Sequence, residues 1–246
     1  MRLRVINPNT TASMTSKIGA AAQAIAAAGT EIEAVNPPMG PVSIEGFYDE
    51  AFAVPGLLGD IAGHPADGYV IACFDDTGLD AARCITDAPV VGIGEAAFHM
   101  ASLLATKFGV VTTLSRSIAA IEHNLAKYGL ATRCSGVRAS DVPVLELERA
   151  DSDGRAKISG EIALALEQDR AEAIVLGCAG MADLAASLSA EHGVPVVDGV
   201  ASAVKLVEGL VQIGLKTSRR GGYADPNPKA YHGMFAPFAP ARDTTN

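Results

Sequence analysis

The sequence has few charged residues, and acidic residues outnumber basic ones. Charged residues make up 19% of the 246-residue chain, and the formal net charge at pH 7 is -9. Nucleic acids and anionic membranes bind proteins through clustered lysine and arginine. The composition therefore argues against both partners and favours a small, diffusible ligand.

Two kinds of apolar segment are also missing. The N-terminus lacks the apolar core and small-residue cleavage site of a signal peptide. No apolar run approaches the roughly 20 residues that span a bilayer. We therefore expect a cytoplasmic protein without a membrane partner. Its cysteines should then be reduced thiols, and they are Cys73, Cys84, Cys134 and Cys178.

The familiar cofactor motifs are absent as well. The chain has no phosphate loop, no dinucleotide glycine fingerprint and no Gly-x-Ser-x-Gly elbow. Its five histidines show no metal-ligand spacing with the cysteines. We accordingly expect neither a metal nor a cofactor.

Short apolar runs alternate with alanine-rich stretches of helical periodicity, which predicts an α/β fold with mostly parallel sheets. Helices are expected near residues 11–28, 78–84, 95–107, 115–128, 155–168, 180–191 and 200–213. The expected strands are Leu3–Ile6, Gly68–Ala72, Val90–Ile93, Gly109–Val111, Ala173–Leu176 and Val194–Val197.

The chain also contains an internal repeat. Val5-Ile6-Asn7 matches Val110-Val111-Thr112, and Tyr69–Cys73 matches Ile174–Cys178, each pair 105 residues apart. Ala88–Gly92 similarly resembles Val194–Asp198. The repeat predicts two similar α/β halves, 1–105 and 106–217, with part of 200–220 a candidate to complete the first. Residues 218–246 are expected to form an extended tail, ordered only by packing on a neighbour.

Cys73 and Cys178 occupy equivalent places in this repeat, each directly after a strand and before a helix. Ligands of open parallel sheets bind outside the carboxyl ends of the strands. A single cysteine there is more often a small buried hydrophobe. Because the two positions match, we instead expect both sulfurs to face one cleft between the halves. Cys84 and Cys134 lack repeat partners, and packing is their expected role.

Several polar residues at strand ends are candidates for ligand contact or for ordinary turn and capping roles. They include Asn9, Asp75, Thr112, Thr113 and Asp198, and Asp76 is expected with Asp75 to cap the helix after Cys73. Glu45 is a candidate contact or a solvated acid. Since acids follow Cys73 closely, while helix N–H groups favour a thiolate, we expect Cys178 to ionise more easily.

Five motifs together resemble the hydantoin racemase family of the aspartate/glutamate racemase superfamily. The likeness extends from the N-terminus to about Ser218, and the two cysteine blocks are specific when found together. The motifs are Ile6–Thr10, Ser43–Gly46, Ile71–Asp76, Val110–Leu114 and Val175–Met181. Thr77 stands where many relatives carry proline, so the resemblance does not predict the conformation of the loop after Cys73.

The resemblance implies two pseudo-symmetric α/β domains with the active site between them, and a cofactor-independent racemase. The catalytic pair would be Cys73 and Cys178, and the substrate a cyclic ureide, either a 5-substituted hydantoin or allantoin. Because Phe74 and Ala179 follow the cysteines, a weakly charged ring is favoured over an amino acid. The implied substrate-contact residues are Asn9, Ile44, Phe74, Asp75, Thr112, Thr113, Gly177, Ala179 and Asp198.

Other interpretations remain open at this stage. Amino-acid racemases, decarboxylases and cis-trans isomerases of the superfamily use similar scaffolds, although two cysteines favour two-sided proton transfer. A non-catalytic thiol or binding protein is disfavoured because the cysteines do not form a Cys-x-x-Cys motif. The superfamily resemblance also implies a homo-oligomer.

Overall fold

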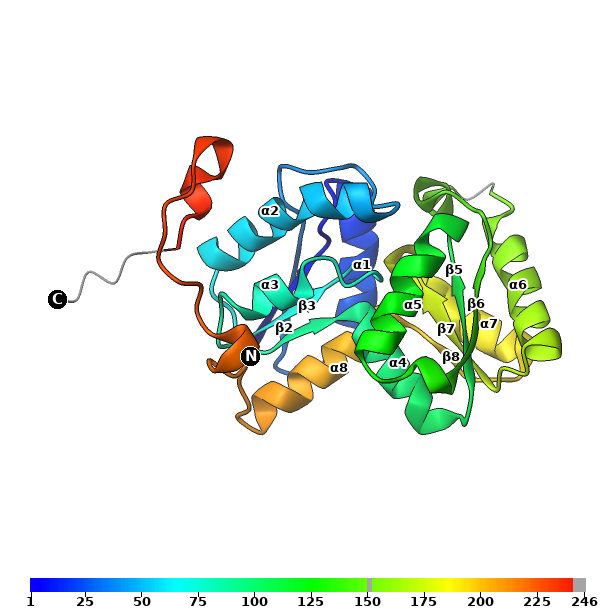
Figure 1. Cartoon of the computed structure of the whole chain (residues 1–246). Coiled ribbons are helices and arrows are strands. Elements are labelled where there is room, and N and C mark those ends of the chain that lie inside the picture. The colour runs from blue at the N-terminus through cyan, green and yellow to red at the C-terminus, as the bar shows by residue number, and fades with distance from the viewer. Residues whose placement is uncertain (150–151, 241–246) are drawn as a thin grey trace.

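The computed structural model describes residues 1–149 and 152–240, and it contains two four-stranded parallel sheets flanked by helices (Figure 1). The last six residues of the expected tail lie outside the described residues. The first sheet has the order β2-β1-β3-β4, and the second has the matching order β6-β5-β7-β8. The predicted α/β class and the two similar halves are therefore confirmed.

The strands of the first sheet are β1 (Arg2–Ile6), β2 (Glu31–Val35), β3 (Gly68–Ile71) and β4 (Val90–Gly92). Those of the second are β5 (Phe108–Thr112), β6 (Cys134–Ala139), β7 (Ala173–Gly177) and β8 (Val196–Val197). The helices are α1 (Ala12–Ile25), α2 (Phe47–Gly63), α3 (Leu79–Arg83), α4 (Ile93–Leu104), α5 (Ile118–Lys127), α6 (Gly154–Gln168), α7 (Ala185–His192) and α8 (Gly199–Gln212).

All six predicted strands are present, but β2, β6 and α2 were not predicted. Strand β2 is half-buried, and its apolar residues alternate with Glu31 and Glu33, which weakens the apolar signal. Strand β6 is a half-buried edge strand of mixed composition. Helix α2 follows a proline-rich segment and contains Pro55, and proline is unfavourable inside a helix, so no helix was expected there.

The two halves share one hydrophobic core. Helix α8 follows β8 in the second half but packs on β3 and α1 of the first, while α4 packs on α8, α5 and β7. Phe98 of α4 is fully buried at the centre of this core. Its ring contacts Phe74 edge-on, at 5.3 Å between centroids, and stacks on Phe108 at 6.0 Å. The side chain thus joins the two sheets.

The start of the tail packs on its own chain, contrary to the expectation that only a neighbour would order it. The Arg219 guanidinium donates hydrogen bonds to the carbonyls of Arg83, Cys84 and Thr86 at 2.7–2.9 Å. The Phe238 ring lies near Gly59 of α2. An arginine that satisfies three carbonyls explains why an aperiodic segment is held here.

We predict that Phe98→Ala lowers the free energy of unfolding by about 3–5 kcal/mol, because it leaves a cavity among aromatic side chains of both halves. Urea denaturation followed by circular dichroism measures this change. Leu103→Ala on the same helix is the control, since Leu103 is 79% exposed, and it should change stability by less than about 0.5 kcal/mol. Equal effects of the two substitutions would contradict the shared core.

Candidate active site

The parallel registers bring the ends of four strands to one place. Ile6 pairs with Ile71, and the N–H of Ala72 donates to the carbonyl of Ile6 at 2.8 Å, so Asn7 and Cys73 both follow this end of the first sheet. In the second sheet Thr112 pairs with Gly177, directly before Cys178. The two halves therefore present equivalent strand ends.

A cleft of about 430 Å³, open to solvent, lies at these strand ends. Cys73 and Cys178 both line it, and each is partly exposed. The first half contributes Asn7, Asn9, Met14, Ile44, Ala72, Cys73, Phe74 and Asp75. The second contributes Thr112, Thr113, Ser117, Val144, Gly177, Cys178 and Ala179.

The cleft brings together both predicted cysteines and eight of the nine predicted contact residues, Asp198 being the ninth. The Asp198 carboxylate instead caps α8 and accepts from the N–H groups of Val200 and Ala201. Glu45 accepts from the N–H of Val144 at 3.4 Å, across the two halves, and is not part of the cleft wall.

Sequence reasoning missed the apolar wall residues Met14, Ala72 and Val144. Met14 lies on α1, whose periodic apolar positions resemble ordinary core residues. Val144 begins a 3-10 turn in an irregular segment that carries no sequence pattern. Ala72 is adjacent to Cys73 and could have been included from that neighbourhood alone.

Asn9 lines the cleft, and its side-chain amide is held in one orientation. Its side-chain oxygen accepts from the N–H of Thr11 at 2.9 Å and from the amide of Asn7 at 2.8 Å. This pattern fixes the amide orientation. The NH₂ group contacts the Met14 sulfur at 3.3 Å, and Asn9 and Met14 both line the cleft. Asn9 can therefore donate to a ligand carbonyl.

Thr112 holds the opposite wall in place. Its hydroxyl is buried and donates to the carbonyl of Gly177 at 3.0 Å. A Cβ at Gly177 would come within 2.8 Å of Thr112 Cβ, so only glycine allows this close approach. The Thr112 proton is thus engaged within the sheet, while Thr113 follows it into the cleft wall.

The loop after Cys73 is fixed by the buried carboxylate of Asp76. This carboxylate was expected to cap the following helix α3, but that helix begins after Gly78, in a left-handed conformation. Asp76 instead caps α4, accepting from the N–H groups of Gly94 and Glu95 at 2.9 and 2.8 Å. It also accepts from the Tyr128 hydroxyl at 2.7 Å.

The chain turns sharply to allow this arrangement. Asp76 adopts a positive φ of 52°, a region that non-glycine residues rarely occupy. A Cβ at Gly92 or Gly94 would lie within 3 Å of the Asp76 carboxylate. Sequence distance hid this contact, since 18 residues separate Asp76 from Gly94.

Each cysteine is influenced by the backbone of the second residue after it. The backbone of Asp75 acts to lower the pKa of Cys73, and that of Gly180 acts to lower the pKa of Cys178. The Thr77 hydroxyl also lies 3.3 Å from the sulfur of Cys73. Thr77 therefore places a hydroxyl in contact with the cysteine.

The electrostatic settings of the two cysteines differ in the predicted order. Burial raises the pKa of Cys178 to about 11, against the N–H of Gly180 and the charge of Lys17, which lower it. Burial raises the pKa of Cys73 further, and the Asp75 carboxylate adds to the effect. At both cysteines burial therefore outweighs the N–H groups that favour a thiolate.

Asp75 is the acidic group of the cleft wall. Burial raises its pKa to about 7, and the nearby carboxylates of Glu50 and Asp76 add to this shift. Oxygen Oε1 of Glu50 is buried without a hydrogen-bond partner. The cleft thus combines apolar walls, a donor amide and one acidic group that titrates near neutral pH.

Residues 1–149 and 152–240 contain neither a metal-binding cluster nor a membrane-spanning helix. In this part of the chain, no group of three or more His, Cys, Asp and Glu residues is arranged to hold a metal ion. No helix among these residues is long and apolar enough to cross a membrane.

Two equivalent strand ends with a cysteine at each define the class of protein to which this chain belongs. The model of the Asp/Glu/hydantoin racemase family matches residues 3–207. The chain is a member of this family.

The individual relatives make the assignment more specific. The hydantoin racemase of Pseudomonas sp. (strain NS671) is 45% identical, and the alignment covers 100% of both chains. That of Rhizobium meliloti is 47% identical over 95% of this chain and 98% of its own. The solved allantoin racemase from Klebsiella pneumoniae is 49% identical, with a TM-score of 0.95 over 98% of this chain and 100% of its own. The chain is accordingly a racemase.

We predict that iodoacetamide alkylates Cys178 at lower pH than Cys73. A raised pKa keeps a thiol neutral until the pH rises, so alkylation of Cys178 should increase about tenfold per pH unit between pH 7 and 10. Mass mapping of the labelled peptides separates these cysteines from Cys84 and Cys134. Asp75→Asn removes a charge that raises the pKa of Cys73, so it should speed labelling of Cys73. Faster labelling of Cys73 than of Cys178 in the unaltered protein would refute the order.

Proposed function

We propose that the protein is a cofactor-independent, two-base racemase of cyclic ureides, with 5-substituted hydantoins as its substrates. The observation that carries the proposal is the pair of cysteines on equivalent strand ends lining one cleft. Inversion of a carbon centre requires a base on one face and an acid on the other. Two cysteines from opposite halves supply this pair.

In the proposed reaction one sulfur is a thiolate and the other a thiol. The thiolate takes the proton from C5 of the ring, forming an S–H bond as the C–H bond breaks. The opposite thiol then donates its proton to the other face of C5. After the reaction the two sulfurs have exchanged their protonation states, so the enzyme is ready to convert the product enantiomer back. The reaction consumes no net proton or electron.

The intermediate is an enolate-like carbanion whose charge lies largely on a ring oxygen. Donors aimed at that oxygen lower the barrier more than any contact to the neutral substrate. The NH₂ group of Asn9 is available for this role, as its oxygen is fixed by Thr11 and Asn7. The Thr112 hydroxyl donates to Gly177, so its part is to shape the wall.

The apolar residues of the cleft support a weakly charged ring as substrate. Ile44, Phe74 and Ala179 are buried side chains on its wall, where an ammonium or carboxylate group would lose its hydration. The names of the similar proteins, hydantoin racemase and allantoin racemase, agree with such a ring.

Asp75 favours allantoin as a second candidate substrate. Allantoin is a hydantoin with a ureido group at C5, and this group carries several N–H donors. The Asp75 carboxyl group lines the cleft and would accept from them. An alkyl or aryl substituent would leave that carboxylate without a partner, which is unfavourable in a partly desolvated site.

We predict that either Cys73→Ser or Cys178→Ser abolishes racemisation, measured by circular dichroism on optically pure hydantoins and allantoin. In deuterated solvent the unaltered enzyme should place deuterium at C5 of early product, while unreacted substrate keeps its proton. This follows because each sulfur serves one face. Equal early washout into substrate and product, or near-normal racemisation by either serine variant, would exclude the two-cysteine mechanism.

We predict that Asp75→Ala lowers kcat/KM for allantoin at least about tenfold more than for a 5-alkyl hydantoin. A hydrogen bond to a charged group contributes about 1.5–3 kcal/mol, and only the ureido substituent can make it. The effect of Asp75 on the pKa of Cys73 is common to both substrates, so the ratio isolates the substituent. If Asp75→Ala left the ratio of kcat/KM for allantoin to that for the hydantoin unchanged, the ureido group would not bind Asp75.

A further inference from the structure

Asp75 and Gly180 each lie two residues after a cysteine. The backbone of each acts on that cysteine, and the carbonyl of each accepts a hydrogen bond from the other half of the molecule. The backbone of Asp75 acts to lower the pKa of Cys73, that of Gly180 acts to lower the pKa of Cys178, and a Cβ at Gly180 would lie 3.6 Å from the Cys178 sulfur. Asp75 lies in a loop and Gly180 in the 3-10 helix Ala179–Leu184, so neither residue is fixed by the hydrogen bonds of a sheet. The position of each sulfur therefore depends on what holds residue 75 or residue 180.

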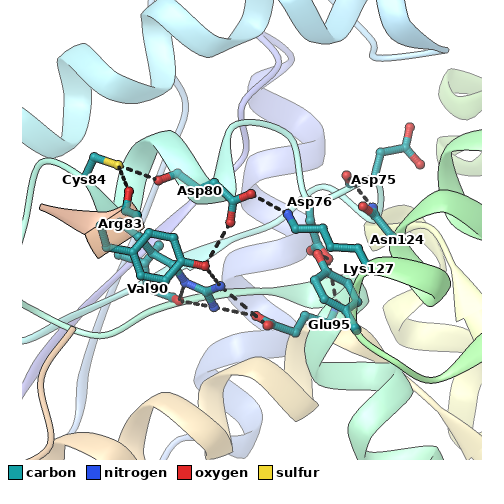
Figure 2. A network of polar contacts seen from close by, with 12 residues as sticks. Asp75, Asp76, Asp80, Arg83, Cys84, Val90, Glu95, Asn124 and Lys127 are labelled. Atoms are coloured by element: carbon teal, nitrogen blue, oxygen red, sulfur yellow. Dashed lines mark hydrogen bonds and ion pairs between the residues drawn. The ribbon is translucent and has the colours of Figure 1, made fainter. Parts of the chain in front are cut away.

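The carbonyl groups of these two residues are held from the opposite half of the molecule. The Asn124 amide on α5 donates to the carbonyl of Asp75 at 2.9 Å, as Figure 2 shows. The Lys17 ammonium on α1 donates to the carbonyl of Gly180 at 2.7 Å. Helix α1 follows the first strand of its half, and α5 follows the first strand of the other.

The two contacts thus join equivalent elements of the two halves: the acceptors are offset by the 105 residues of the cysteines (180 − 75), and the donors on α1 and α5 by 107 (124 − 17). Each is partly buried and joins residues distant in sequence, 49 apart for Asn124 and 163 apart for Lys17. Lys17 also forms an ion pair with Asp183 of the second half at 2.9 Å. Misplacement of a reacting group by about 1 Å can lower a rate about 100-fold, so such contacts bear directly on rate.

We propose that Asn124 and Lys17 are crossed positioning residues, by which each half of the protein holds the catalytic cysteine of the other half against the substrate carbon. The inference rests on the proposed two-cysteine function. It adds that each half positions the cysteine of the other half, in addition to forming one wall of the shared cleft.

The two positioning residues differ in charge, so their substitution should affect the cysteines differently: one changes a pKa and a position, the other a position alone. The charge of Lys17 lowers the pKa of Cys178, and the charges of Asp75 and Glu45 raise it. Lys17→Met should therefore raise the pKa of Cys178 and loosen its loop. Asn124 is neutral, so Asn124→Leu should act on the Cys73 loop through position alone.

Proton exchange by one-cysteine enzymes tests the proposal. In Cys178→Ser, Cys73 alone can exchange the C5 proton of one enantiomer with deuterated solvent, and in Cys73→Ser, Cys178 can exchange that of the other. Asn124→Leu should slow exchange about 10- to 100-fold in the first background and less than about twofold in the second. Lys17→Met should show the reverse pattern, and Lys17→Arg should retain most of the rate.

Lys127→Met is the matched control. Lys127 of α5 pairs with Asp80 at 2.6 Å, also across the two halves, but contacts neither cysteine loop (Figure 2). It should change both exchange rates less than about twofold. Asn124→Ala serves as a second variant where Asn124→Leu lowers the melting temperature. Equal slowing of both exchanges by one variant, or slowing by Lys127→Met, would overturn the proposal.

Alkylation separates this proposal from the proposed function. If neither one-cysteine enzyme exchanges protons, the two-base mechanism fails, yet labelling of Cys73 and Cys178 in the full enzyme still reports on their loops. Asn124→Leu should then change the labelling rate of Cys73 alone, because its loop is released. Lys17→Met should move the pH midpoint for Cys178 upward and leave Cys73 unchanged. Changes at both cysteines, or at neither, would exclude crossed positioning.

Discussion

The buried carboxylate of Asp76 is the interaction on which the arrangement of the cleft depends. Its two oxygens accept from the start of α4, which links the halves, and from Tyr128, which ends α5 in the second half. Because one oxygen accepts from both Glu95 and Tyr128, the Cys73 loop, α4 and α5 are fixed to a single group. Burial raises the pKa of Asp76 to about 7, because its carboxylate is removed from water where the three elements meet. Loss of the carboxylate would leave several buried donors without partners.

The fold could be predicted where burial makes the sequence pattern strong. Strands β3 and β7 are buried along their length and form continuous apolar runs. Their similarity, together with that of β1 and β5, was sufficient to reveal the two halves. Strands β2 and β6 lie at sheet edges, where partial exposure removes the apolar signal. The return of α8 to the first half could be suspected from the repeat boundary, but only tertiary packing places it on β3.

The site residues that directly follow a strand could be predicted from the sequence. Residues next to a cysteine, such as Phe74 and Ala179, follow from the sheet register. Asp198 belongs to the same pattern, since it follows β8, but its carboxylate is engaged by the first turn of α8. The contacts to the segments after the cysteines come from helices distant in sequence. No local sequence pattern predicts that the Asn124 amide binds the carbonyl of Asp75, 49 residues away.

The pseudo-symmetry of the backbone does not extend to the electrostatics of the cleft. The charges of Asp75 and Glu50 raise the pKa of Cys73, whereas the charge of Lys17 lowers the pKa of Cys178, so the two thiols have different pKa values. For a substrate with one stereocentre, the enantiomers have equal free energies in water, and an enzyme cannot alter that equality. The ratio of kcat/KM in the two directions is therefore fixed at one, whatever the difference between the cysteines. The asymmetry can change only which sulfur rests as the thiolate, and hence how kcat and KM divide in each direction. Selection on racemisation thus constrains the positions of the two sulfurs more tightly than the similarity of their surroundings.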